Sequence, residues 1–236
     1  MDKHLFTFVN YNDLPYPDAY QPCIHEVAAH FDKTIIGSYP RYSLHTEYSY
    51  GKRKFDSEIM RKLSPLSQAH RNGIPQLWSS LDWTKAFADF IFMLTDNLPA
   101  PEIIEIHPPF NDYCCPQQFS QYFSTFEQQI HRIYSQTKIV IENRSGSLYR
   151  GGKFLFSNSQ DIVTLCNLIE HDSLNLGIVL DFPQLLTAEK KEYIKQEYIK
   201  EKNDFHEEDI KNKEKNFYQG DCGETVVLSA AVMHGP

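Results

Sequence analysis

Polar side chains that can bind a divalent metal follow three strongly apolar segments of the sequence. His107 ends EIIEIH, Glu142 ends KIVIE and Asp181 ends GIVLD. Each segment is a short, nearly continuous apolar run, which is typical of a strand covered on both faces. The carboxyl ends of parallel strands meet at one face of an α/β barrel, so we expect these three side chains to lie close to a common point. An imidazole and two carboxylates are suitable ligands for Zn²⁺, Mn²⁺ or Fe.

A fourth candidate ligand, His234, follows the apolar segment TVVLSAAVM. Each of these residues also has a simpler explanation when it is taken alone. A histidine at a strand end is often a hydrogen-bonded structural residue, and an aspartate there often caps the next helix. Their joint occurrence at the ends of neighbouring strands favours a shared site that holds one or two ions.

The elements that must position these residues alternate along the chain between short apolar runs and segments of helical periodicity. The sequence predicts strands at 5–9, 34–39, 73–78, 102–107, 138–142, 177–181 and 225–233, and helices at 22–31, 56–71, 82–94, 117–135 and 159–170. Ser57 and Ser80 are plausible caps for two of these helices. Such alternation implies parallel pairing with right-handed crossovers. We therefore expect an α/β fold of the TIM-barrel type, in one domain over 1–236. The sequence predicts about seven strands, so we expect the barrel to be incomplete or truncated at its C-terminus.

A highly charged segment near 188–216 interrupts the βα alternation. Its acids and lysines interleave in similar numbers, which favours a solvated helical insertion over a nucleic-acid-binding arm. The formal net charge of −8 argues against a broad nucleic-acid-binding surface but leaves room for a local basic groove.

The composition favours a cytoplasmic protein. No apolar run approaches the roughly 20 residues that a membrane helix needs, so we expect no membrane partner. The N-terminal sequence lacks the pattern of a signal peptide. Five cysteines without a CxxC pair are therefore interpreted as reduced thiols.

The segments IEIHPPF, IVIENRSG and LGIVLDFPQLLTA, in this order and spacing, resemble strands four to six of the xylose isomerase-like barrel superfamily. This superfamily includes endonuclease IV, the UV-damage endonucleases and many sugar isomerases and epimerases. The resemblance covers roughly residues 80–234. It implies a metal-binding barrel in which His107 matches an HPG histidine, Glu142 a bridging glutamate and Asp181 the aspartate of a DxxH motif.

The resemblance also implies roles for residues beside these motifs. His234 matches a later histidine ligand, and His45, in YSLHTEY, resembles the histidine of strand three. The alternative for His45 is a loop histidine among tyrosines. Asn143, Arg144 and Gln184 are candidates for contacting the substrate. The chain departs from the pattern at His-Pro-Pro, at Gln184, where a histidine ligand is expected, and at HGP, where the sequence ends before the next ligands.

Three functions remain open. The first is divalent-metal-dependent hydrolysis of phosphodiesters in nucleic acid, similar to endonuclease IV, and the EN-x-x-G form of ENRSG favours it. The second is a sugar isomerase or epimerase, in which a metal polarises a carbonyl and Glu142 serves as the catalytic base. The third is a non-catalytic barrel that has lost its metals, because a fold alone does not define a function.

Overall fold

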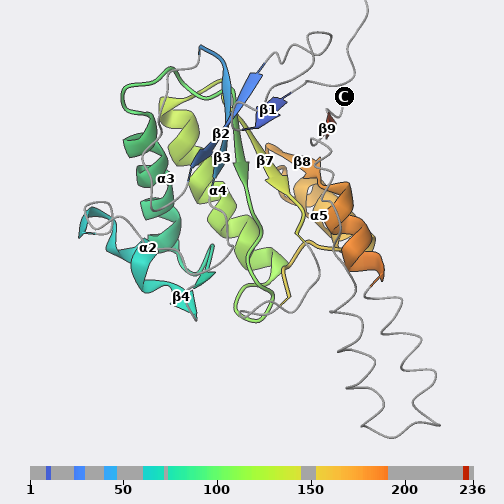
Figure 1. Cartoon of the computed structure of the whole chain (residues 1–236). Coiled ribbons are helices and arrows are strands. Elements are labelled where there is room, and N and C mark those ends of the chain that lie inside the picture. Colours follow the sequence, from blue (N-terminus) through green and yellow to red (C-terminus); the bar gives the residue numbers. More distant parts are fainter. Residues whose placement is uncertain are drawn as a thin grey trace, which may run out of the picture.

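The computed structural model describes residues 9–11, 24–29, 40–46, 61–71, 74–144, 153–190 and 231–233. In these ranges, seven strands form one sheet in the order β1-β2-β3-β6-β7-β8-β9 (Figure 1). Their bounds are Val9–Tyr11 for β1, Ile24–Ala29 for β2, Tyr42–Thr46 for β3, Ile103–Ile106 for β6, Lys138–Glu142 for β7, Leu176–Leu180 for β8 and Ala231–Met233 for β9.

The first six strands of this sheet are parallel and follow one another in chain order. Right-handed crossovers that always step in the same direction place the connecting helices on one face of the sheet, as in an α/β barrel. β9 is antiparallel to β8. Among the described strands, no pairing joins the two edges of the sheet. The expected α/β class is confirmed and the arrangement is consistent with a partial barrel, whereas a closed TIM barrel stays a prediction.

Three long helices cover one face of the sheet: α3 (Leu81–Thr95), α4 (Pro116–Ile133) and α5 (Ser159–Asp172). α3 packs against α4, and α4 packs against α5. The Ser80 side chain accepts a hydrogen bond from the backbone N–H of Trp83, so this serine is the cap that the sequence predicts for α3. Asn158 caps α5 in the same way, through the N–H of Asp161.

Successive side chains of each strand point to opposite faces of the sheet, and both faces are buried. Leu44, Ile104, Ile106, Ile139 and Ile141 pack with the helices in the main hydrophobic core. The opposite face carries a second, smaller apolar cluster, made of Ile24, Ile103, Val140 and Val179. A parallel sheet buried on both sides accounts for the nearly continuous apolar runs of the sequence.

Several predicted elements between residues 80 and 180 are confirmed, but the N-terminal half differs from the prediction. The helix expected at 22–31 is wrong, because Ile24–Ala29 forms β2. Within 56–71, the structure has a short helix α2 (Ser64–Gln68), followed by the strand β4 (His70–Arg71). The strand expected at 73–78 is reduced to β5 (Ile74–Pro75), which pairs with β4 in a separate antiparallel hairpin.

Other expectations fall partly or wholly outside the described residues. These are the strand at 34–39, the proposed cap Ser57, most of 5–9 and of 225–233, and the charged insertion beyond residue 190. Within the described ranges, no helix combines the length and the apolar character needed to cross a membrane.

Candidate metal site

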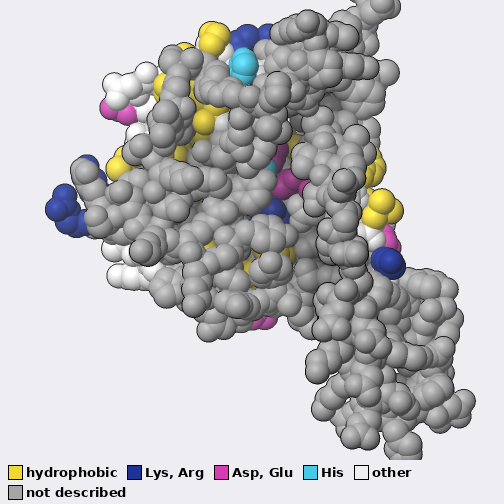
Figure 2. Space-filling view, in the orientation of Figure 1, with side chains coloured by type: hydrophobic (Ala, Val, Ile, Leu, Met, Phe, Trp, Pro, Cys, Tyr) yellow, Lys and Arg dark blue, Asp and Glu magenta, His cyan; other side chains and the backbone are white. Residues whose placement is uncertain are grey.

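Ionisable side chains gather on the sheet face opposite the helices, directly beyond the smaller apolar cluster. His45 is opposite Glu105 in the register of β3 and β6. Ile103 and Glu105 alternate along β6 and His107 directly follows the strand, so these side chains share the face that carries the smaller apolar cluster. Figure 2 shows acidic, histidine and basic side chains close together near the middle of one face of the molecule.

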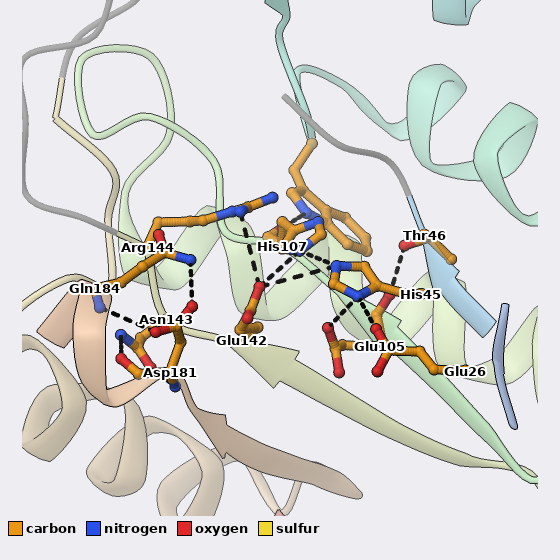
Figure 3. A network of polar contacts seen from close by, with 11 residues as sticks. Glu26, His45, Thr46, Glu105, His107, Glu142, Asn143, Arg144, Asp181 and Gln184 are labelled. Carbon is orange, nitrogen blue, oxygen red and sulfur yellow. Dashed lines mark hydrogen bonds and ion pairs between the residues drawn. The ribbon is translucent and has the colours of Figure 1, made fainter. Parts of the chain in front are cut away.

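Four buried side chains present ligand atoms to one small volume: His45, Glu105, His107 and Glu142. One ligand atom from each residue lies within 4.8 Å of all the others. The Nε2 atoms of His45 and His107 are 3.0 Å apart, and the Nε2 of His107 is 3.0 Å from Oε2 of Glu142 (Figure 3). Oε2 of Glu142 is also 3.9 Å from Nε2 of His45.

These separations fit the chemistry of a divalent cation. Nitrogen and oxygen ligands bind Zn²⁺ at about 2.0–2.2 Å, so two ligands on one ion lie roughly 3–4 Å apart. The three distances above fall in this interval, and small side-chain movements would bring the fourth ligand to the same ion. A buried cluster of His45, Glu105, His107 and Glu142 could therefore hold a metal ion.

Backbone anchors hold the strand that supplies two of these ligands. The buried indole Nε1 of Trp78 donates a hydrogen bond of 2.7 Å to the carbonyl oxygen of His107. The Thr46 hydroxyl donates a hydrogen bond of 2.6 Å to the carbonyl oxygen of Glu105. Trp78 has a φ of 59°, which is a rare conformation for a bulky residue. Its ring is fixed by edge contacts with Phe87, Phe119 and Phe126.

Burial and mutual contact set the protonation of the cluster. Burial opposes protonation of His45, but the carboxylates of Glu105, Glu26 and Glu142 outweigh it and raise the pKa of this histidine to about 9. Burial, opposed by the His45 imidazole and reinforced by the Glu142 carboxylate, raises the pKa of Glu105 to about 8. In the metal-free protein, protons on His45 and Glu105 therefore neutralise part of the carboxylate charge that a bound divalent cation would otherwise neutralise.

A guanidinium lies beside the cluster. Nη1 of Arg144 is 3.8 Å from Oε2 of Glu142, and Arg144 is almost completely buried. Its backbone N–H donates to the carbonyl oxygen of Phe156, which fixes the chain directly after β7. The arrangement places a permanent positive charge next to a candidate metal ligand.

Asp181 has a different environment from the other predicted ligands. Its carboxylate accepts hydrogen bonds from the backbone N–H and the side-chain Nε2 of Gln184, at 3.0 and 2.8 Å. Residues 182–190 are helical, so Asp181 caps this helix. Figure 3 shows Asp181, Asn143 and Gln184 grouped apart from the histidines. A ligand role for Asp181 and a substrate contact by Gln184 stay predictions.

The side chain of Asn143 joins the ends of β7 and β8. Its amide nitrogen donates to the carbonyl oxygen of Asp181 at 3.1 Å, and its oxygen accepts from the N–H of Asp181 at 2.7 Å. The amide therefore extends the pairing of the two strands, and a role in substrate binding stays a prediction. His234 lies outside the described residues. β9, which precedes it, runs against the direction of the other strands.

The structure thus brings together three of the predicted ligands, His45, His107 and Glu142, and adds Glu105 as a fourth candidate ligand. Glu26 contacts the Nδ1 atom of His45 and is not one of the four. Sequence reasoning missed Glu105 because it looked for polar residues at strand ends. A charged residue two positions before His107, inside an apolar strand, is the signal that could have identified it.

Comparisons of the chain with protein-family models, curated proteins and solved structures found no match.

Proposed function

We propose that this protein is a divalent-metal-dependent hydrolase of phosphodiester bonds in nucleic acid, built on a barrel of the xylose isomerase-like type. The observation that carries the proposal is the position of Arg144 next to a buried cluster of two histidines and two glutamates. Arginine binds phosphate oxygens through a planar set of donors, so its presence beside a metal-binding cluster favours an anionic substrate group.

His45, Glu105, His107 and Glu142 would hold the ion, with Zn²⁺, Mn²⁺ and Fe as the candidates. A bound ion of this kind supplies Lewis-acid activation of water and stabilises developing negative charge. Arg144 binds and orients the phosphate group. Glu142 is the catalytic candidate, because its carboxylate lies between His107 and Arg144 and can accept a proton near the reacting atoms.

The experiment combines elemental analysis of the purified chain with cleavage of a duplex DNA that contains an abasic site. We expect bound metal, cleavage that a chelator abolishes, and activity that falls as salt rises because phosphate contacts release counterions. Glu142→Gln should lower both metal content and cleavage, by roughly 100-fold or more for the latter. Glu102→Gln is the matched control, because Glu102 forms an exposed ion pair with Arg41.

Bound metal without DNA cleavage would contradict the hydrolase proposal. If the purified chain contains no metal, the result would favour a non-catalytic barrel instead.

A sugar isomerase or epimerase is the second candidate, and it is favoured by the small size of the cluster. The four ligand atoms lie close enough for one ion, which is sufficient to polarise a carbonyl. Arg144→Gln distinguishes the two reactions. The substitution should lower DNA cleavage much more than turnover of a neutral ketose, since a neutral sugar offers no phosphate to the guanidinium and its turnover is affected through loss of the contact with Glu142.

A further inference from the structure

Glu26 of β2 contacts the cluster without belonging to the group of four candidate ligands. Its Oε1 is 2.5 Å from Nδ1 of His45, whereas Nε2 of the same ring is directed at His107 (Figure 3). The two nitrogens of His45 therefore have separate partners. The Glu26 side chain is 18% exposed, compared with 4% for His45, so Glu26 approaches the imidazole from the more accessible side.

A carboxylate on the far nitrogen of a metal-binding imidazole has a defined effect. It accepts the Nδ1 proton, fixes the orientation of the ring, and increases the basicity of the nitrogen that faces the metal. Glu105 also lies near Nδ1, at 3.0 Å, but Glu105 is itself one of the four candidate ligands. When Glu105 is engaged by the ion, Glu26 is the acceptor that remains for Nδ1.

The register of the sheet explains why Glu26 can reach His45. Glu26 pairs with Ser43, and His45 follows two positions later on the same face of β3. Ile24 lies two positions before Glu26 and belongs to the small apolar cluster beneath the site. Both the carboxylate and the imidazole therefore project from adjacent strands on the face that carries the ligands.

We propose that Glu26 is a positioning residue, which holds His45 with Nδ1 protonated and Nε2 directed into the metal site. This inference rests on the proposed metal site and adds a residue that holds one of its ligands. Glu26 touches neither ion nor substrate in this role, so it acts through His45 alone.

The test measures Zn²⁺ affinity of the full chain by calorimetry for the wild type, Glu26→Gln, Glu26→Ala and the control Glu102→Gln. Loss of a carboxylate behind a ligating histidine lowers metal affinity about 10–100-fold. We expect Glu26→Ala to show this loss and Glu26→Gln a smaller one, because the glutamine oxygen still accepts the Nδ1 proton. Glu102→Gln should bind as the wild type does.

A spectroscopic measurement separates positioning from a general effect on folding. In the ¹⁵N spectrum of the Zn²⁺-loaded wild type, His45 should show a protonated Nδ1, and this proton should be less well protected from exchange with water in Glu26→Ala. Wild-type affinity in both Glu26 variants would overturn the inference while leaving the metal site intact. A wild-type chain that binds no Zn²⁺ would overturn the proposed function, and this inference with it.

Discussion

Acidic groups outnumber permanent cations in the buried cluster, and this imbalance controls its behaviour at the scale of single residues. Three carboxyl groups surround His45, while Nη1 of Arg144 lies 3.8 Å from Oε2 of Glu142. Carboxylates at such short range cannot all be ionised without compensation, so one of them keeps its proton or a cation is bound. In the metal-free protein, the neighbouring carboxylates raise the pKa of His45 and burial raises the pKa of Glu105, so these two groups hold protons.

We therefore expect the metal-free protein to lose stability as pH rises from about 5 to 9. The folded-state pKa of His45, about 9, exceeds its ordinary value of 6.5, and that of Glu105, about 8, exceeds its ordinary value of 4.5. A group whose pKa is raised in the folded state stabilises the fold fully at pH values below its unfolded-state pKa. This contribution is lost as the pH rises through the folded-state pKa. The loss from Glu105 is complete above about pH 8 and that from His45 above about pH 9.

Urea unfolding of the metal-free chain between pH 5 and 9 measures this effect. Glu105→Gln removes one of the two titrating groups, so its free energy of unfolding should fall less steeply with pH than that of the wild type. Glu102→Gln should follow the wild-type curve. A wild-type stability that increases over this interval would contradict the assignment.

At the scale of elements, the segment before α3 connects the helix layer to the site. Trp78 is held in a left-handed backbone conformation by its aromatic neighbours, and its indole N–H fixes the carbonyl of His107. Residues kept in such sparsely populated conformations often support functional sites. The aromatic core between α3 and α4 therefore influences the position of His107, the candidate ligand that directly follows β6.

Trp78→Phe should destabilise the fold by about 1–3 kcal/mol, because the buried carbonyl of His107 loses the indole donor. It should also weaken Zn²⁺ binding, since His107 loses an anchor. Trp83→Phe is a matched control. Trp83 is equally buried, but its indole nitrogen has no hydrogen-bond partner among the described residues. Calorimetry showing equal Zn²⁺ affinities for the two variants would contradict the proposed anchoring role.

Ser80→Ala tests the cap of α3 by itself. The substitution removes the acceptor for the N–H of Trp83 and should lower the free energy of unfolding by about 1 kcal/mol. Zn²⁺ affinity should change little, because the hydrogen bond that the hydroxyl accepts lies within the first turn of α3. Thermal unfolding measures the first effect, and a stability equal to that of the wild type would show that the cap contributes nothing.

Sequence reasoning succeeded where local signals and the fold agree. The segments that became α3, β6, α4, β7, α5 and β8 each have a long amphipathic pattern or a short apolar run. It failed at β2, where Ile24 packs on one face of the sheet and Val27 on the other. A strand buried on both faces can imitate helical spacing over a few residues, and Glu26 interrupts its apolar run. Functional residues often break the local pattern in this way.

Part of the candidate site was predictable, because two of its residues stand where local sequence signals and the fold agree. His107 and Glu142 stand at the ends of clear strands, so the parallel topology was enough to bring them together. Glu105 and Glu26 lie inside strands, and their contribution depends on which face each strand turns toward the site. That orientation follows from the register of the sheet, which one sequence does not reveal.

At the scale of the whole molecule, the cluster links strands that are distant in the chain. His45 and His107 are 62 positions apart, and His107 and Glu142 are 35 apart. The three strands β3, β6 and β7 are neighbours in the sheet, and α3 and α4 lie in the connections between them. An ion held by residues from all three strands binds the folded chain and has no equivalent site in the unfolded one.

Bound metal should therefore raise the thermal stability of the entire fold. At a free Zn²⁺ concentration 100 times the dissociation constant, binding to the folded state alone adds about 2.7 kcal/mol. For a chain of this size, this corresponds to an increase in Tm of roughly 5–10 °C. Glu142→Gln should lose most of the increase, whereas Glu102→Gln, whose substituted residue lies in an exposed ion pair, should keep it. Calorimetric melting of the three proteins with and without Zn²⁺ provides the measurement. An equal rise in all three would place the bound metal elsewhere on the chain, because only an ion held by Glu142 is sensitive to its replacement.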